Sequence, residues 1–262
     1  MTSISRLLEI MRRLRDPKRG CPWDRAQDFR SIAPYTIEEA YEVADAIENN
    51  DREELREELG DLLFQVVFHS QLAEEKGWFD FEAVAAGISD KMIRRHPHIF
   101  DATYEAESGD QAKAWEAIKA EERRYKAGTQ APSVLDGVAL ALPALMRAQK
   151  LSKRASRVGF DWDDLKGVFD KVREELAELE AEVEQDAAQA RLEDELGDIL
   201  FACTNLARHL KVDAEVALRG ANAKFERRFR HVERLMAERG QALADADMDT
   251  LESAWQAAKR EE

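Results

Sequence analysis

The chain has 262 residues, of which 44% are hydrophobic and 35% are charged, with only 6 prolines and 12 glycines. This composition suits one large domain or two ordinary ones, and it excludes a disordered chain or a turn-rich β protein. The formal net charge of −15 argues against generic binding to nucleic acid or to an anionic membrane, because both select basic surfaces.

Export and membrane signals are not found in the sequence. The N-terminal segment becomes charged too early for a secretory signal, and the longest apolar stretches are far too short to span a bilayer. The two cysteines, Cys21 and Cys203, lie far apart and form no CxxC motif, which argues against a zinc site or a disulfide framework. We therefore expect a soluble cytoplasmic protein.

Hydrophobic residues recur with a period of 3.6 along most of the chain, which predicts an all-α fold. In the first half, helices are expected over 4–15, 37–49, 52–76 and 81–96. Residues 16–36 are expected to form a loop, because glycine and several prolines interrupt them. Thr36 is the predicted N-cap of the second helix, with Glu39 as its capping-box partner, and Asp51 is the predicted N-cap of the third.

The second half repeats this succession of helices. Residues 101–110 are polar and loop-like, and 126–137 have the composition of a linker. Beyond the linker, a loop is expected around 159–164, and helices are expected from about 143, over 165–185, 190–211 and 213–239, and in a last segment that ends near 260. We therefore expect an N-terminal module over 1–125, the linker over 126–137, and a C-terminal module over 138–262.

Short motifs recur in the same order in both halves. EEAYE at 38–42 returns as EELAE at 174–178, ELGDLLF at 58–64 as ELGDILF at 195–201, KMIRRHPH at 91–98 as KFERRFRH at 224–231, and WEAIK at 115–119 as WQAAK at 255–259. This is an internal duplication, and two copies favour two similar helical bundles over a solenoid, which needs at least three repeats.

Each copy carries the pattern E-E-x-x-E followed by E-x-x-D. The carboxylates are Glu38, Glu39, Glu42, Glu58 and Asp61 in the first copy, and Glu174, Glu175, Glu178, Glu195 and Asp198 in the second. Helical residues three or four apart lie side by side, so these like charges repel unless a cation lies between them. A duplicated structural helix that keeps the pattern is the alternative explanation.

A helical projection of the second copy places these acids beside the apolar stripes. The first stripe comprises Val168, Val172, Leu176, Leu179 and Val183, and the second comprises Leu192, Leu196, Ile199, Leu200 and Cys203. Glu175 and Glu178 fall to one side of the first stripe, and Glu195 and Asp198 fall to one side of the second. All-oxygen ligands favour Mg²⁺, with Mn²⁺ as a substitute, and Mg²⁺ usually shares its shell with substrate phosphates. A nucleotide or polyphosphate is therefore the expected substrate class.

A basic helix and one tryptophan near the end of the chain complete the candidate residues. Lys224, Arg227 and Arg228 lie within about one helical turn; they either meet a triphosphate or form a solvated stripe that pairs with neighbouring glutamates. Trp255, with Lys259 one turn on, either stacks on a purine or packs in the core. Di-iron, HD-type and Nudix chemistry are disfavoured, because their His-containing or Arg- and Gly-containing motifs are missing or incomplete.

Over essentially its whole length the chain resembles the MazG family of nucleoside triphosphate pyrophosphohydrolases, all-α enzymes of bacteria. The resemblance is carried by RLLEIMRRLRDP at 6–17, GCPWD at 20–24, APYTIEEAYEV at 33–43, EELGDLLFQVVF at 57–68, PALMRAQK at 143–150, VGFDW at 158–162 and KFERRFR at 224–230. It implies two helical modules, a homodimer, and Mg²⁺-dependent hydrolysis of NTPs and dNTPs to the monophosphate and pyrophosphate with broad base tolerance. It also implies that the C-terminal module is catalytic and the N-terminal one structural.

By motif, the resemblance assigns Glu175, Glu178, Glu195 and Asp198 as the catalytic metal ligands. The implied nucleotide contacts are Lys171, Val172, Arg173, Glu174, Glu175, Arg191, Leu192, Glu193, Asp194, Lys224, Phe225, Glu226, Arg227, Arg228, Trp255 and Lys259. The residues themselves do not rank the two copies, apart from Pro97, which ends the first copy's basic helix early. A non-catalytic Mg-nucleotide sensor and a purely structural acidic dimer are the alternative functions.

Overall fold

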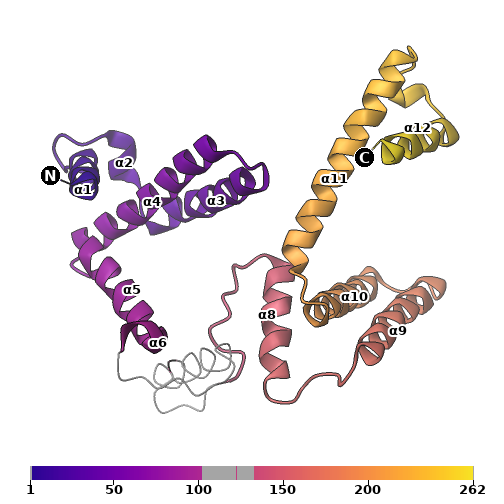
Figure 1. Cartoon of the computed structure of the whole chain (residues 1–262), viewed down its shortest axis with the longest axis horizontal. Helices are drawn as coiled ribbons and strands as arrows, with labels where there is room; N and C mark the ends of the chain where they lie inside the picture. The colour runs from indigo at the N-terminus through magenta and orange to yellow at the C-terminus, as the bar shows by residue number, and fades with distance from the viewer. Residues whose placement is uncertain (1, 102–121, 123–132, 262) are drawn as a thin grey trace. The chain divides into compact units, whose positions relative to one another are not determined.

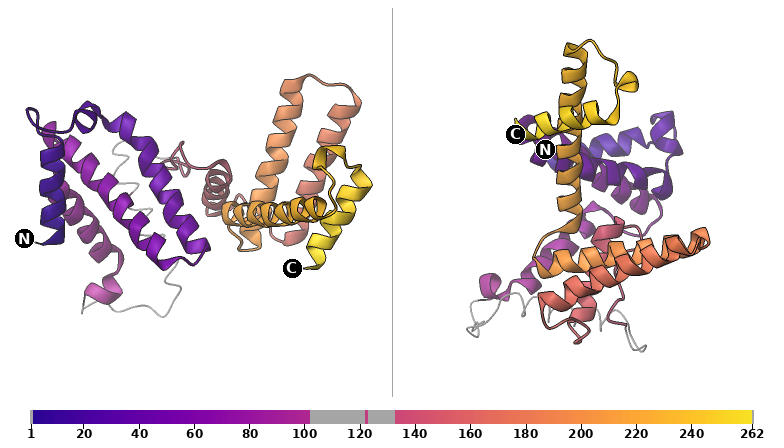
Figure 2. Two further views of the ribbon diagram at one scale, coloured as in Figure 1. Left: turned by 90° about the horizontal axis from the view of Figure 1, so that it is seen from above. Right: turned by 90° about the vertical axis from the view of Figure 1, so that its right-hand side faces the viewer.

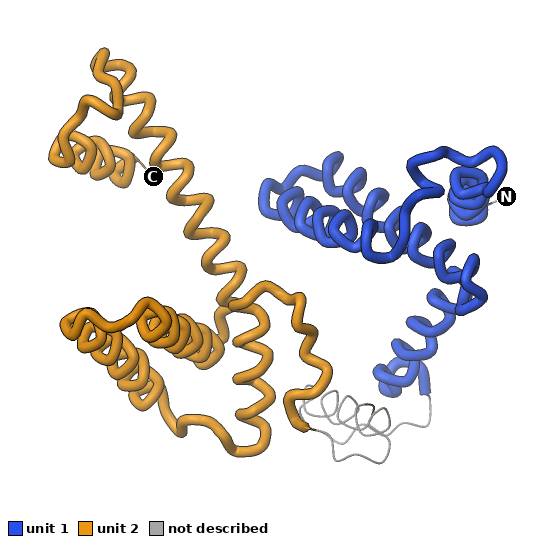
Figure 3. Tube along the Cα trace, turned by 180° about the vertical axis from the view of Figure 1, so that it is seen from behind, with its two compact units in different colours: residues 1–118 blue, residues 119–262 orange. Residues whose placement is uncertain are grey.

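The computed structural model describes residues 2–101, 122 and 133–261, and all the regular elements within them are helices (Figure 1). The predicted all-α class is therefore confirmed. The chain divides into two compact units, 1–118 and 119–262 (Figure 3). Most of 101–110, the WEAIK motif at 115–119 and most of the predicted linker lie outside the described residues, so the predicted module boundaries stay a prediction. Within the described residues, no helix is both long and apolar enough to cross a membrane.

Unit 1 is built around a long helical hairpin. Its described helices are α1 (Ser3–Leu14), α2 (Pro22–Ala26), α3 (Phe29–Glu48), α4 (Arg52–Glu75), α5 (Phe81–Arg95) and α6 (Pro97–Phe100). Helices α3 and α4 form the hairpin, and α1 and α5 both pack against α4. The core lies on α4 and the helices beside it, and its buried members are Met11, Ile32, Val67, Phe68 and Leu72.

Arg15 ties the end of α1 to the end of α4. Its side chain is only 7% exposed, and its Nε and Nη2 donate to the two carboxylate oxygens of Glu75, each at 2.7 Å. This hydrogen bonding lowers the pKa of the Glu75 carboxyl, against the opposing effect of burial. The guanidinium also lies 5.3 Å from the ring centre of Phe68, so a charged group caps the apolar core.

The predicted loop over 16–36 is wrong in two places: α2 occupies Pro22–Ala26, and α3 occupies most of the second half, so that the predicted N-cap Thr36 lies inside a helix. Helix α3 begins at Phe29, eight residues before the expected start at Ile37, and runs through Pro34. Asp28 is its N-cap: its carboxylate accepts from the backbone N–H groups of Arg30 and Ser31, while its own N–H donates to Ser31 Oγ at 2.8 Å. This capping box satisfies the helix start upstream, so the one hydrogen bond that Pro34 removes does not end the helix.

Removal of the Asp28 cap should weaken unit 1 measurably. We expect Asp28→Ala to lower the free energy of unfolding of unit 1 by about 1 kcal/mol, because two backbone N–H groups lose their acceptor. Urea denaturation followed by circular dichroism measures the change. Asp90→Ala, an exposed substitution in the interior of α5, is the control and should have little effect. Equal stability of the two variants would contradict Asp28 as the cap.

Unit 2 repeats the hairpin and adds a long helix. Its described elements are α8 (Ala144–Ser156), α9 (Leu165–Glu184), α10 (Gln189–His209), α11 (Ala214–Glu238), a short 3₁₀ segment η1 (Leu243–Asp245) and α12 (Met248–Arg260). Helices α9 and α10 form the hairpin, α8 packs on α10, and α12 packs on α11. From its start at the end of α10, α11 extends away from the hairpin (Figure 2). Wherever the sequence predicts a helix start or end in this half, the structure agrees with it to within two residues.

Candidate functional site

Each hairpin brings carboxylates from its two helices into one cluster. In unit 2, Glu175 of α9 meets Glu195 and Asp198 of α10, and each offers an oxygen within 4.8 Å of the others. In unit 1, the same holds for Glu39, Glu42 and Glu58. The repeated sequence pattern therefore corresponds to a repeated structure, which we call the second cluster and the first cluster. Glu178, Asp61, Glu38 and Glu174 lie outside these two sets.

Burial in unit 2 differs from the helical projection. Glu175 and Glu195 are 5% and 7% exposed and face the interior of the hairpin. Leu176 and Leu200, which were expected in the buried stripes, are 49% and 51% exposed. The projection assumed that the apolar residues mark the contact between the helices. Here that contact includes the acids, and several stripe leucines face outward.

Two cations neutralise the buried acids of the second cluster. Lys171 Nζ donates to Glu174 and lies 2.7 Å from Glu175 Oε1, and Arg191 Nη2 lies 2.7 Å from Glu195 Oε1. Burial is the largest effect on the pKa of Glu195 and raises it; Arg191 opposes the shift, and the charge of Glu178 adds to it. The ion pairs raise the pKa of Lys171. The spacing of four residues in both pairs was a signal in the sequence that the motif reading did not use.

The first cluster has a different environment. Gln65 of α4, which sequence reasoning missed, donates its Nε2 to Glu39 Oε1 at 3.2 Å. Burial and then the charge of Asp61 raise the pKa of Glu39, while burial and then the charge of Glu42 raise that of Glu58. Among the described residues, no Lys, Arg or His forms an ion pair with these three carboxylates.

The remaining predicted nucleotide contacts lie near the second cluster or on the last two helices. On α9 and α10, Val172 and Leu192 are half-buried, while Arg173, Glu193 and Asp194 are exposed. On α11, Phe225 lies 5.4 Å from the Trp255 ring centre to centre, and the Arg228 guanidinium lies 5.9 Å from the same ring. Trp255 also packs against the core between α11 and α12. Lys224, Glu226, Arg227 and Lys259 are exposed.

The structure therefore brings one half of the predicted site together but leaves the other half apart. The carboxylates, Lys171 and Arg191 meet within the α9–α10 hairpin. The basic stretch and Trp255 belong to the α11–α12 pair, which extends away from that hairpin (Figure 2). Trp255 packs against the core and is also partly exposed. This is consistent with both predictions for it, which are packing in the core and stacking on a purine.

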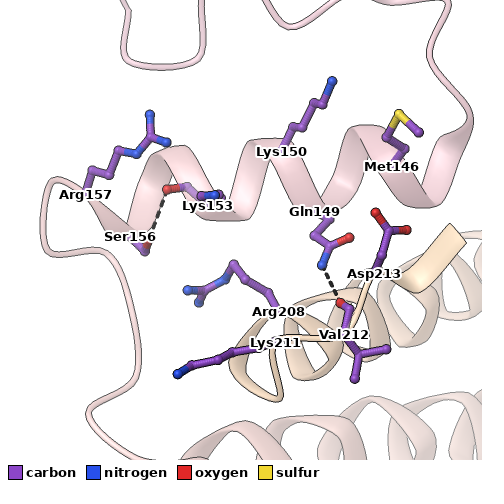
Figure 4. Close-up of a pocket in the computed structure, with 10 residues that line it drawn as sticks. All are labelled: Met146, Gln149, Lys150, Lys153, Ser156, Arg157, Arg208, Lys211, Val212 and Asp213. Atoms are coloured by element: carbon purple, nitrogen blue, oxygen red, sulfur yellow. Dashed lines mark hydrogen bonds between the residues drawn. The ribbon is translucent and has the colours of Figure 1, made fainter. Parts of the chain in front are cut away.

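A separate cavity of about 580 Å³ lies between α8 and the turn from α10 to α11 (Figure 4). Its lining includes five cations, which are Lys150, Lys153, Arg157, Arg208 and Lys211. Gln149 of α8 joins the two walls by donating its Nε2 to the carbonyl oxygen of Val212 at 2.7 Å. No carboxylate of the second cluster lines this cavity, and its positive lining does not suit a metal ion.

Comparison with known proteins identifies relatives of the whole chain. The model of the MazG nucleotide pyrophosphohydrolase domain matches residues 27–100 and 165–233. The nucleoside triphosphate pyrophosphohydrolase of Escherichia coli K12 is 56% identical over 100% of this chain and 99% of its own. A Thermotoga maritima protein named nucleoside triphosphate pyrophosphohydrolase/pyrophosphatase MazG is 43% identical over 97% of this chain and 94% of its own. The crystal structure of a mazG-related protein from the same organism is 28% identical, covers 44% of this chain and 98% of its own, and has a TM-score of 0.38.

Proposed function

Because the chain belongs to the MazG nucleotide pyrophosphohydrolase family, we propose that its second cluster is the place where an NTP or dNTP is cleaved to the monophosphate and pyrophosphate. The chain is a nucleoside triphosphate pyrophosphohydrolase, as are the full-length relatives by name. The observation that carries the choice of site is the convergence of Glu175, Glu195 and Asp198 within a segment that the family model matches.

The residues present fit a hard divalent cation. Three carboxylate oxygens lie within 4.8 Å of one another, and two of their side chains are buried, so a bound cation would be partly shielded from water. Oxygen ligands of this kind suit Mg²⁺ or Mn²⁺. Glu175, Glu195 and Asp198 would hold the ion, with Glu178 beside them. Such an ion, when bound, supplies Lewis-acid polarisation of the phosphates and a more acidic water.

The cations of the site suit a triphosphate. Lys171 and Arg191 contact the carboxylates of the cluster directly. If a metal ion binds these carboxylates, the two cations can pair with phosphate oxygens instead. Lys224, Arg227 and Arg228 supply further positive charge, and Trp255 offers a partly exposed ring for the base. Stacking uses the π face that all bases share, so we expect broad base tolerance.

Differences between the copies support the second as the reactive one. Unit 2 has Lys171 and Arg191 at its acids, whereas the described residues of unit 1 offer the first cluster no cation. The basic helix is also longer in unit 2, where α11 has 25 residues, while α5 has 15 and is followed by Pro97. A polyphosphate therefore finds more positive charge in unit 2.

The outward-facing leucines of unit 2 favour a homodimer. Leu176, Leu196 and Leu200 on α9 and α10 are each about half exposed, and Phe201 is 44% exposed. A large exposed apolar face on a folded unit usually marks an interface, and most homo-oligomers are two-fold dimers. A second copy of the same face would cover these side chains.

We expect Leu200→Glu to convert the proposed dimer to a monomer at micromolar concentration, because a charge placed within an apolar interface is costly to desolvate. Size-exclusion chromatography with light scattering measures the mass. Leu140→Glu introduces the same charge at a position that is 83% exposed and should leave the mass unchanged. A wild-type monomer, or a Leu200→Glu dimer, would refute this interface.

The reaction itself is tested by incubating the full chain with NTPs and dNTPs and Mg²⁺, then separating the products by anion exchange. Monophosphate and pyrophosphate are expected, and chelation of the metal should stop their release. Diphosphate and orthophosphate would overturn the proposed cleavage. Nucleotide binding without turnover would instead favour the non-catalytic sensor. A cytoplasmic location, which the sequence predicts, would place the enzyme with this substrate pool.

A further inference from the structure

The cavity between α8 and the turn from α10 to α11 gathers positive charge in a chain whose formal net charge is −15. Among the residues that line it, five are cations and one, Asp213, is an acid. The carboxylate of Asp213 is the N-cap of α11, where it accepts from the backbone N–H groups of Glu215 and Val216 at 3.0 Å each. Of the cations, Lys150 and Arg157 point away from the end of α10 (Figure 4). The remaining three leave an excess of positive charge, which favours an anionic ligand.

These three cations come from both walls of the cavity. Within the described residues, Lys153 of α8 and Lys211 after α10 form no ion pair. The Arg208 side chain is only 15% exposed; it pairs with Asp161 and donates its Nε to Asn205 Oδ1 at 2.9 Å, so its guanidinium is held in place. Arg208 and Lys211 both lie between α8 and the end of α10 (Figure 4). One anion in this space can therefore meet positive charge from two helices.

The backbone at Lys211 has a conformation that disfavours lysine. Its φ is +59°, in the left-handed region, whereas the turn after α4 has Gly77 at φ +67°. The other described non-glycine residues with a positive φ are Asn50 and Asp186, two types that adopt this conformation more readily. Glycine would avoid the unfavourable position of a Cβ at this turn. The presence of lysine there points to a role for its ammonium group.

A single amide holds the two walls together. Gln149 of α8 donates its Nε2 to the carbonyl oxygen of Val212 at 2.7 Å, and its Oε1 accepts from the backbone N–H of Ala214 at 3.3 Å. These bonds fix the turn, and with it Lys211, relative to α8. A ligand therefore does not bear the entropy of bringing the walls together. The volume of about 580 Å³ lies within the range of about 300–1,000 Å³ that is usual for small-molecule sites.

We propose that this cavity is a second anion site, which binds a pyrophosphate group, free or as part of a nucleotide, without a metal ion. Lys153, Arg208 and Lys211 would supply the positive charge. A pyrophosphate group has charged oxygens on two phosphorus atoms, so it can contact cations of both walls at once, unlike a single phosphate. The lining acid, Asp213, is already used as a helix cap. The proposal does not rest on the hydrolytic activity of the chain.

Isothermal titration calorimetry of the full chain with pyrophosphate in excess EDTA tests the proposal, because chelation leaves only binding that needs no metal. Lys153→Gln and Lys211→Gly are each expected to weaken this binding at least about 10-fold, the usual effect of losing one charge-assisted hydrogen bond. Lys166→Gln removes the same charge at an exposed position of α9 outside the cavity and should bind as the wild type does. Lys211→Gly should also keep or raise the Tm, since glycine suits this turn, so misfolding would not explain its loss of binding.

A purely structural role for the same lysines predicts a different result. Lys153 lies in the last turn of α8, where a cation stabilises the helix through its dipole. If this were the only role of such cations, Lys153→Gln and Lys211→Gly would leave pyrophosphate binding unchanged, and the proposal would be wrong. Absence of binding in the wild type, or loss of binding in Lys224→Gln on α11, would also overturn it.

Competition identifies the source of the bound group. Displacement of pyrophosphate by ADP at a similar concentration would assign the cavity to a nucleotide, and displacement by inorganic polyphosphate alone would assign it to a free anion; both results support the proposal. AMP or orthophosphate that displaced pyrophosphate equally well would overturn the assignment to a pyrophosphate group. A chain that binds pyrophosphate here but releases none from NTPs would refute the proposed function and leave this site standing.

Discussion

Replacement of Glu175 by glutamine is expected to lower the rate of pyrophosphate release by about 100-fold or more. Glu175 is the contribution of α9 to the second cluster, it is buried, and it carries one of the three oxygens that converge there. Loss of a group that merely supports a metal ligand costs about 10- to 100-fold, and loss of a charged ligand costs more. Lys171 would also lose one of its two anionic partners and keep only the exposed Glu174. Steady-state assays with ATP and a range of Mg²⁺ concentrations measure the effect.

The matched substitution in the first copy serves as the control. Glu39→Gln removes the corresponding acid of unit 1, and we expect its rate to stay within about three-fold of the wild type, because most effects of residues remote from a reaction site are modest. High Mg²⁺ should not restore the Glu175→Gln rate fully, since the ligand itself is missing. If Glu39→Gln abolished hydrolysis while Glu175→Gln retained it, the reaction would belong to the first cluster.

Phe68→Ala is expected to destabilise unit 1 by about 3–5 kcal/mol, the usual cost of truncating a fully buried aromatic side chain. Phe68 is 1% exposed at the centre of the core, and the Phe64 ring meets it edge to face with centres 6.1 Å apart. The substitution also removes the ring on which Arg15 lies. Urea denaturation should therefore show a transition at markedly lower urea that belongs to unit 1.

The control for this loss is Phe160→Ala, an identical change at a position that is 77% exposed in unit 2. It should alter the unfolding free energy by less than about 0.5 kcal/mol, as most surface substitutions do. Since the chain divides into two compact units, the transition of unit 2 should stay in place in Phe68→Ala. A uniform shift of both transitions would show that the units unfold as one.

Periodicity and capping residues predicted most helices well, because local patterns determine them. Asp51 is an N-cap as expected, whereas the predicted N-cap Thr36 lies inside α3. The start of α3 was missed because prolines were read as breaks, whereas the hydrogen bonds between Asp28 and Ser31 fix the helix start upstream of Pro34. A capping box of this type is visible in sequence only when Asp and Ser are considered three residues apart.

The candidate site was predictable in part. The repeated pattern identified carboxylates that do converge, since spacing along a helix and a hairpin connection are both local properties. Which acids are buried was not predictable, because Glu175 and Leu176 exchange their expected exposures through packing between helices. Gln65 was missed because a single amide within an apolar run gives no periodic signal.

The ion pairs of Lys171 and Arg191 also determine how the charges of unit 2 are arranged before any substrate binds. Each of these pairs lies within one helix and gives a buried glutamate its counter-charge, while Arg191 also reaches Glu182 of α9 at 2.8 Å and so joins the two helices. On the proposed function, a nucleotide with its ion would meet helices that are already joined, and it would not bear the entropy of bringing them together. Binding would then exchange partners between charges that are already in place, which leaves more of the interaction energy available as affinity.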